Sequence, residues 1–145
     1  MRVMVSRVKC ASVKVDDQVV GECGCGLLIL SCFTEGDSLK EIEYLVNKCV
    51  NLRIFDDENG VMNKSIQVIG GSILSISQFT LYADASKGNR PSYFKALKGE
   101  EASKLFDTFN EKLGKIVKTE TGIFGADMQI SALHDGPVTI IIDSK

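Results

Sequence analysis

The sequence predicts a strand-rich α/β (α+β) protein. We expect one domain, residues 1–145, in which a mixed or antiparallel sheet curls into a barrel-like body with two main helices packed outside it. Three observations support this class. Short runs of β-branched and aliphatic residues, bounded by turn residues, recur along the chain. Two segments carry the apolar period of a helix, and they are set between predicted hairpins. A chain of 145 residues is long enough to bury one core of its own.

The first half of the chain predicts a hairpin, a buried strand and a helix. Residues 2–15 and 18–20 are rich in β-branched residues and flank Asp16-Asp17, as in a hairpin. Residues 27–30 are continuously apolar, which is typical of a strand buried on both faces. Ser38 and Glu41 then form a capping box that starts a helix. Its apolar positions are Leu39, Ile42, Leu45, Val46, Cys49 and Val50.

The second half predicts a further hairpin and a second helix. Residues 51–55 look extended and 56–60 form a turn, after which 66–69 and 73–81 read as a hairpin through Gly70-Gly71. A helix follows at about 100–113, with Gly114 as its stop signal. Its apolar stripe is Ala102, Leu105, Phe106, Phe109 and Leu113. Residues 128–131 and the apolar run 140–142 are the last strands.

Composition excludes several classes of protein. The chain is 44% hydrophobic and 25% charged, which is ordinary for a globular protein. No apolar run approaches the roughly 20 residues of a membrane span, and the alternating N-terminus lacks the apolar region of a signal peptide. We therefore expect a cytoplasmic protein with no membrane partner.

The cysteines predict neither disulfides nor a metal centre. Their number, five, is odd, and no export signal precedes them. Cys23-Gly-Cys25 lacks the usual two-residue spacer and a second ligand pair, and His134 is the only imidazole. No phosphate loop or dinucleotide fingerprint is present. We expect no metal and no cofactor.

The net charge of −2 limits the partners. Proteins that neutralise many phosphates are usually basic. If this chain binds nucleic acid, we expect it to hold a short end rather than a long duplex of DNA.

Polar side chains gather near the end of the segment 73–81. Ser77, Gln78 and Thr80 occupy both faces there and precede the loop 83–91, where a site is well placed. Hydrogen bonding within a strand or loop is the alternative for each, as it is for Thr139. Any Ser-His-Asp arrangement must use His134, the only histidine, and the side chain of the adjacent Asp135 points away from it in an extended segment. Any catalysis must then depend on backbone donors or on the substrate.

The C-terminal stretch contains the pair Gly136-Pro137. Pro137 is one of only two prolines in the chain. Proline removes a backbone donor, and glycine removes the side chain beside it. The pair can therefore bring bare backbone close to a ligand or a second chain, although Gly-Pro also commonly marks a turn.

Two motifs and several supporting segments resemble one known family. Residues 77–81 read Ser-Gln-Phe-Thr-Leu, and 135–139 read Asp-Gly-Pro-Val-Thr. They are similar to the Ser-Gln-x-x-Leu and Gly-Pro-Val-Thr motifs of the D-aminoacyl-tRNA deacylase family. Supporting matches are residues 1–8, 51–55, 62–65, 87–92 and 121–128. They follow the family's order along nearly the whole chain.

The resemblance implies a homodimer that hydrolyses the ester between a D-amino acid and the 3′-terminal adenosine of tRNA, a chiral proofreading step in translation. It implies a cis Gly136-Pro137 peptide that enters the partner's site as a backbone filter, so that glycyl esters partly escape it. Arg7, Val138 and Thr139 would support that filter.

The resemblance also implies roles for the other motif. Ser77, Gln78, Phe79 and Thr80 form the catalytic segment, with the Phe79 N–H stabilising the oxyanion and the ribose 2′-hydroxyl assisting. Phe124 and Met128 would contact the terminal adenosine, with core packing as the alternative, and Lys87 and Arg90 would meet phosphates. The chain departs from the family where His134 replaces an asparagine and Ser6 a glutamine.

Two other functions remain open at this point. One is a non-catalytic module that binds tRNA ends. The other is a small-ester hydrolase with a threonine nucleophile, Thr80 or Thr139, although no activating base lies near either in sequence.

Overall fold

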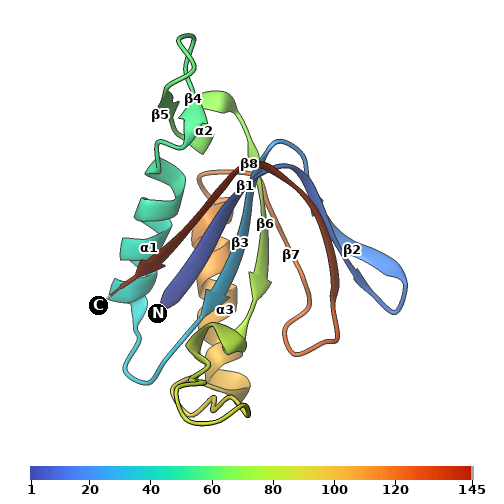
Figure 1. Ribbon diagram of the computed structural model, residues 1–145, viewed down its shortest axis with the longest axis vertical. Helices are drawn as coiled ribbons and strands as arrows, with labels where there is room; N and C mark the ends of the chain where they lie inside the picture. The colour runs from blue at the N-terminus through green and yellow to red at the C-terminus, as the bar shows by residue number, and fades with distance from the viewer. Residues whose placement is uncertain (145) are drawn as a thin grey trace.

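The computed structural model describes residues 1–144 and contains a curled six-stranded sheet with helices on one side of it, and a separate two-stranded sheet of β4 and β5 (Figure 1). The sheet order is β2-β1-β3-β6-β7, and β8 pairs with β1. The strands are β1 (Arg2–Val15), β2 (Gln18–Cys23), β3 (Gly26–Cys32), β6 (Ser72–Ser77), β7 (Thr119–Thr121) and β8 (Gln129–Asp143). The other elements are α1 (Leu39–Asn51), β4 (Phe55–Asp56), β5 (Met62–Lys64), α2 (Ile66–Ile69), η1 (Phe79–Tyr82) and α3 (Gly99–Gly114). The predicted fold class is confirmed.

The N-terminal hairpin forms as predicted. β1 and β2 pair antiparallel around Asp16 and Asp17, whose φ values of 48° and 61° are those of a tight hairpin turn. β1 also pairs antiparallel with β3 and β8, so this one strand joins most of the sheet. The sheet curls so far that β2 and β7, the first and last strands of its order, approach each other. The Glu22 N–H on β2 donates to the Glu120 carboxylate on β7 at 2.8 Å.

The predicted second hairpin is wrong. Ile66–Ile69 is the single-turn helix α2, which Ser65 caps at its start and Gly70, with φ 64°, ends. Four residues, three of them apolar, carry no decisive period, so the two capping residues decide the conformation. β6 then pairs parallel with β3, and it stops at Ser77, four residues earlier than predicted.

Two smaller differences concern neighbouring segments. α1 continues through Asn51, so that only Phe55 of the predicted extended segment lies in a strand, β4, which also includes Asp56 of the predicted turn. β7 was not predicted. It has only three residues and pairs in parallel with β6, so the sequence carries no alternation long enough to indicate a strand.

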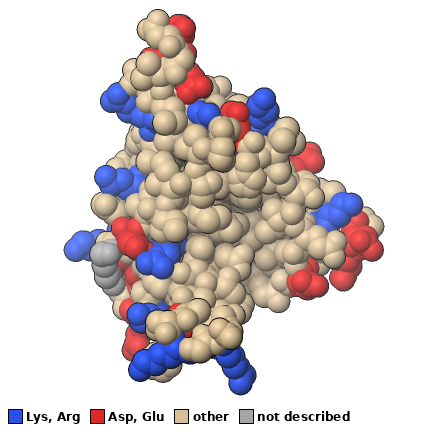
Figure 2. All heavy atoms as spheres, in the orientation of Figure 1, with Lys and Arg blue, Asp and Glu red and all other residues tan. Residues whose placement is uncertain are grey.

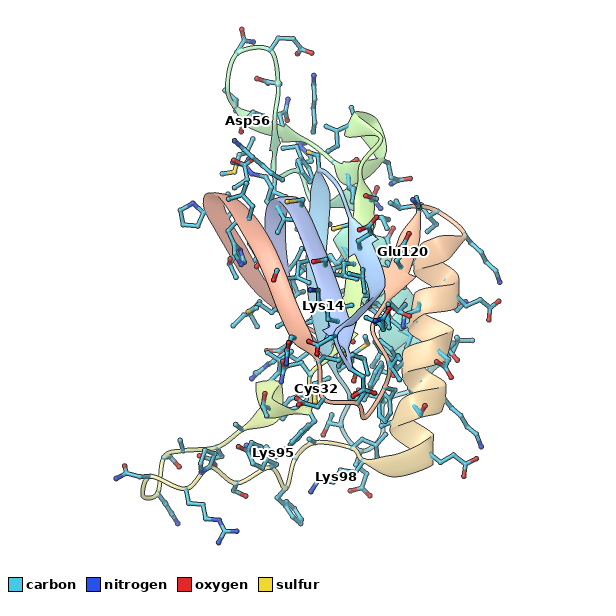
Figure 3. The ribbon with its side chains drawn as sticks, turned by 90° about the vertical axis from the view of Figure 1, so that its right-hand side faces the viewer. Lys14, Cys32, Asp56, Lys95, Lys98 and Glu120 are labelled. Carbon is cyan, nitrogen blue, oxygen red and sulfur yellow. The ribbon has the colours of Figure 1, made fainter. Side chains whose placement is uncertain are left out.

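The two main helices pack side by side against one face of the sheet, and the core lies between (Figures 1 and 3). The capping box of Ser38 and Glu41 is present at the start of α1. Helix residues such as Ile42 and Phe109 are fully buried against Leu27 and Ile73 of the sheet, whereas Leu39 is half exposed. A second cluster, including Leu28 and Leu74, fills the inside of the curl. β3 is therefore buried on both faces, as its sequence predicts.

β8 joins the two predicted C-terminal strands into one. It runs through Gly136-Pro137, whose peptide bond is cis, and its pairing with β1 shifts at that point. Within residues 1–144, β8 pairs with no strand other than β1. Ile130, Leu133 and Ile141 are exposed along it. None of the helices in this part of the chain has the length and apolar character needed to span a membrane.

Candidate active site

A pocket lies where two parallel strands end. Ser31 near the end of β3 is the register partner of Ser77 at the end of β6, so both carboxyl ends meet at one edge of the sheet. This edge is where open α/β sheets usually bind ligands, because loops diverge from it. The parallel pairing that sequence analysis missed therefore positions the site.

The pocket encloses about 320 Å³. Strand ends, the first turn of α3 and the loop before β8 contribute to its wall. The lining residues are Ser31, Cys32, Phe33, Ser77, Gln78, Phe79, Leu97, Lys98, Gly99, Ala102, Phe124 and Gly125. Figure 3 shows Cys32 and Lys98 at this end of the molecule. The structure thus brings together four predicted site residues, Ser77, Gln78, Phe79 and Phe124.

The segment after β6 presents backbone donors. The Gln78 N–H donates to the Ser31 carbonyl at 2.7 Å, which fixes the end of β6 against β3. The chain then enters η1, whose first return bond is from Leu81 N–H to the Gln78 carbonyl at 3.2 Å. Phe79 and Thr80 occupy the first turn, where amide donors have no partners within the helix. Backbone N–H groups without a partner are of the kind that can stabilise a developing negative charge.

The side chains in direct contact with Phe79 and Thr80 are neutral, whereas Lys98 lines the pocket and Arg2 donates to the Leu81 carbonyl of η1 at 3.1 Å. The Gln78 Nε2 donates to the Thr80 hydroxyl at 2.6 Å, and the Phe79 ring packs edge-on against Tyr93 with centroids 5.1 Å apart. Burial raises the pKa of the Cys32 thiol to about 11, and its Sγ donates to the Phe79 carbonyl at 3.4 Å. The Cys32 thiol is therefore protonated near neutral pH and is a poor nucleophile.

One buried hydroxyl in the pocket wall lacks a partner among the described residues. Ser31 is 1% exposed, and its Oγ makes no hydrogen bond within residues 1–144. A buried hydroxyl without a partner is costly, which makes Ser31 an unusual feature of the pocket wall.

Gly136-Pro137 is braced by a buried arginine of the same chain. The Arg7 Nε donates to the Asp135 carbonyl at 3.1 Å, and its Nη1 donates to the Ile54 carbonyl at 2.7 Å. Asp56 and Asp135 add carboxylate oxygens at 3.3 and 3.4 Å from the guanidinium. Arg7 is 7% exposed, so its side chain occupies the space beneath Gly136-Pro137. Its hydrogen bonds and ion pairs tie this segment to the neighbouring backbone.

Glycine is required at position 136. Its φ is 121°, and a Cβ there would lie 2.9 Å from the Val138 Cγ2 and 3.2 Å from the Arg7 Nη2. Any side chain would be both strained and crowded. The local sequence therefore presents bare backbone at this point, as expected.

The two predicted motifs lie far apart within one chain. Ser77 pairs with Ser31, Ser31 with Val3, and Val3 with Ile142. Three strand spacings across the sheet and the five residues from Ile142 back to Pro137 place the motifs roughly 20 Å apart. Figure 3 shows Asp56, a partner of Arg7, at the opposite end from Cys32.

The remaining predicted residues lie outside the pocket. The Thr139 hydroxyl is 3.0 Å from the Ser6 hydroxyl, and Val138 is partly buried against the main core. Met128 packs against the second core cluster, which agrees with its alternative interpretation. Lys87 and Arg90 are exposed in the loop between η1 and α3.

Sequence analysis did not propose several lining residues as site residues. They are Ser31, Cys32, Phe33, Leu97, Lys98, Gly99, Ala102 and Gly125. The only signal was indirect: Cys32-Phe33 ends a strand whose continuous apolar character predicted burial on both faces. These strand residues come next to the start of α3 only through tertiary packing, which a local sequence pattern does not show.

Fold and pocket define a small strand-rich α/β protein with a ligand pocket built from backbone donors and apolar walls. The chain belongs to the D-Tyr-tRNA(Tyr) deacylase family, whose model matches residues 4–143. Members of this family are hydrolases that act on aminoacyl-tRNA, and this chain is an enzyme of that type.

Two solved structures are similar over the whole chain. A c-Myc DNA unwinding element binding protein is 38% identical, with a TM-score of 0.94, and the alignment covers 100% of this chain and 99% of that one. A probable eukaryotic D-amino acid tRNA deacylase is 19% identical, with a TM-score of 0.81 and 98% of both chains covered. The second shares the fold.

Proposed function

We propose that this chain hydrolyses the ester between a D-amino acid, or glycine, and the 3′-terminal adenosine of tRNA, as a chiral proofreading step in cytoplasmic translation. The observation that carries the proposal is the composition of the pocket. It offers backbone N–H groups and apolar walls, and its thiol and hydroxyls lack an ionised partner. Such a pocket suits a substrate that brings part of its own catalytic machinery.

The apolar wall is suited to the adenosine. Phe33 and Phe124 line the pocket, and an adenine base stacks favourably on an aromatic ring. The volume of about 320 Å³ lies at the lower end of the range for small-molecule sites. The Ser31 hydroxyl is a candidate partner for a polar group of the nucleoside.

The catalytic step follows from the donors on η1. The Phe79 N–H stabilises the negative charge that develops on the ester carbonyl oxygen when water attacks. The ribose 2′-hydroxyl, adjacent to the ester, assists the proton transfer. Ser77 and Gln78 hold the end of β6 and so position the Phe79 donor. The Thr80 hydroxyl accepts a hydrogen bond from the side-chain amide of Gln78.

Selection of the D-ester is assigned to Gly136-Pro137 of a second copy of the chain. The two motifs are roughly 20 Å apart in one chain, and β8 carries exposed apolar residues along an edge without a strand partner among residues 1–144. These observations support a homodimer in which backbone from one copy enters the pocket of the other. There it excludes the side chain of an L-residue.

A threonine nucleophile is less well supported. The recorded side-chain partner of Thr80 is a neutral amide, and that of Thr139 is the neutral hydroxyl of Ser6. Neither partner can accept a proton near neutral pH, so neither activates the threonine.

Release of labelled amino acid from matched D-Tyr-tRNA and L-Tyr-tRNA tests the proposal. We expect rapid release from the D-ester alone. Binding of tRNA without release from either ester would support the non-catalytic module instead. Equal release from both would contradict the filter.

A further inference from the structure

One aromatic side chain is almost fully exposed beside the pocket. Phe94 is 94% exposed, the highest value among the exposed large hydrophobic residues. It lies between η1 and α3, in the loop at the lower end of Figure 1. Its ring contributes nothing to the core, so its exposure calls for a physical reason.

The backbone around Phe94 is fixed. Tyr93 packs against Phe79, the Thr34 hydroxyl donates to the Lys95 carbonyl at 2.6 Å, and the Leu97 N–H donates to the Phe33 carbonyl at 2.9 Å. An Ala96 N–H to Tyr93 carbonyl bond of 3.1 Å closes a turn around Phe94. Exposure of the ring is therefore held by the fold.

The surrounding segment is strongly basic. Residues 85–99 contain Lys87, Arg90, Lys95 and Lys98 and no Asp or Glu, in a chain whose net charge is −2. Figure 2 shows basic side chains at the lower end of the molecule, and Figure 3 shows Lys95 and Lys98 there below Cys32. Local charge of this kind attracts phosphate in spite of the acidic chain.

A second pocket, of about 600 Å³, adjoins the candidate active site. Its wall includes Tyr93, Phe94 and Lys95, and it shares Leu97 and Lys98 with the first pocket. Glu35 and Glu101 also line it. Carboxylates repel a phosphate but accept a hydrogen bond from the amino group of cytosine, which favours a base in this pocket and phosphates along the basic segment.

We propose that Phe94 is a stacking platform for the cytidine that precedes the terminal adenosine of tRNA, with Lys87, Arg90, Lys95 and Lys98 paired to the flanking phosphates. This inference rests on the proposed function, since it places the adenosine in the first pocket. The two pockets share a wall, and the two nucleotides are consecutive. An aromatic ring and nearby cations are the usual means of holding single-stranded nucleic acid.

The test compares a full and a truncated substrate. Phe94→Ala should raise KM for D-Tyr-tRNA about tenfold, because stacking of one base is lost. It should leave hydrolysis of 3′-O-D-tyrosyl-adenosine unchanged, because that ester lacks the cytidine. Phe94→Trp should restore the KM for tRNA. Val68→Ala, which removes an exposed apolar side chain on α2, is the matched control and should change neither substrate.

Binding of uncharged tRNA separates this inference from the proposed function. If the wild-type chain hydrolyses neither ester but Phe94→Ala still weakens tRNA binding about tenfold, the platform stands and the hydrolase assignment fails. Three results would overturn the platform: no change in KM with tRNA, an equal loss with both esters, or no tRNA binding by a wild-type chain that is also inactive. A tRNA with an abasic penultimate nucleotide should bind wild type and Phe94→Ala equally.

Discussion

The two ends of the sheet differ in how they are built. The pocket end is hollow, with apolar walls, a neutral thiol and amide donors on η1. The Gly-Pro end is filled, and the buried guanidinium of Arg7 ties Gly136-Pro137 to the neighbouring backbone at Ile54. In our proposal one end receives the ligand, and the other presents rigid backbone.

This difference explains why one chain is an incomplete enzyme in our proposal. The oxyanion donors of the pocket contact only the ester oxygen, which is the same in D- and L-esters, and a braced projection with no pocket beside it has nothing to exclude. Placing the projection of one copy in the pocket of another joins the two properties.

The largest effect is expected from removing one donor at the pocket end. Phe79→Pro deletes the N–H at the first position of η1, where proline fits the backbone. We expect kcat for D-Tyr-tRNA to fall about 10²–10³-fold, the usual loss of one oxyanion donor. Single-turnover hydrolysis measures it.

The control for this variant is Phe79→Ala, which loses the same ring but keeps the N–H. It should reduce kcat less than tenfold, since the Phe79 ring is half exposed and packs mainly on Tyr93. Similar losses in the two variants would mean that the ring, and not the backbone donor, matters.

At the Gly-Pro end the largest effect is on stability. Arg7→Ala leaves the Ile54 and Asp135 carbonyls without their donor, and we expect the free energy of unfolding to fall by about 3 kcal/mol. Arg2 on the same strand is a matched control, because it pairs with Asp143 while one-third exposed. Arg2→Ala should cost about 1 kcal/mol or less. Urea unfolding of both variants gives the comparison, and equal losses would show that Arg7 is not a special brace.

Mixing two variants tests whether the ends combine between copies. Pro137→Ala frees φ at the filter and should lower the preference for D-Tyr-tRNA over L-Tyr-tRNA about tenfold while changing the free energy of unfolding little. Excess Phe79→Pro chains, which carry an intact filter and an inactive pocket, should then restore that preference in the mixture. If each pocket used the filter of its own chain, the mixture would keep the low preference of Pro137→Ala.

The sequence was sufficient for features that depend on neighbouring residues. Asp16-Asp17 specify a tight turn, Ser38 and Glu41 a helix start, and residues 27–30 a buried strand. Gly136-Pro137 could be recognised as bare backbone for the same reason. Each of these features is decided within a few residues of chain.

The sequence was insufficient where distant segments decide the outcome. Residues 66–69 carry no decisive period, so the hairpin was wrong and the parallel pairing of β3 with β6 was missed. That pairing brings Ser31 and Cys32 to Ser77 and completes the pocket. The distance between the two motifs likewise follows from strand order, which no local pattern encodes.

The smallest expected effect is on the pH dependence of the free energy of unfolding. Burial raises the pKa of Cys32, at the pocket end, to about 11 and that of Cys49, on α1, to about 12, from the ordinary value of 9.0. Above pH 9 the unfolded chain loses thiol protons that the folded chain keeps, so the unfolded state binds fewer protons and stability falls as pH rises. At pH 10 the Cys49 contribution is on the order of 1 kcal/mol. Urea unfolding at pH 8 and pH 10 should therefore show a smaller loss in Cys49→Ala than in wild type.

Cys32→Ala should also lose less stability between pH 8 and pH 10 than wild type does. Arg7→Ala, which alters the other end, should keep the full loss. If Cys32→Ala kept it too, the thiol in the pocket wall would not be the buried, neutral group on which the description of that end depends.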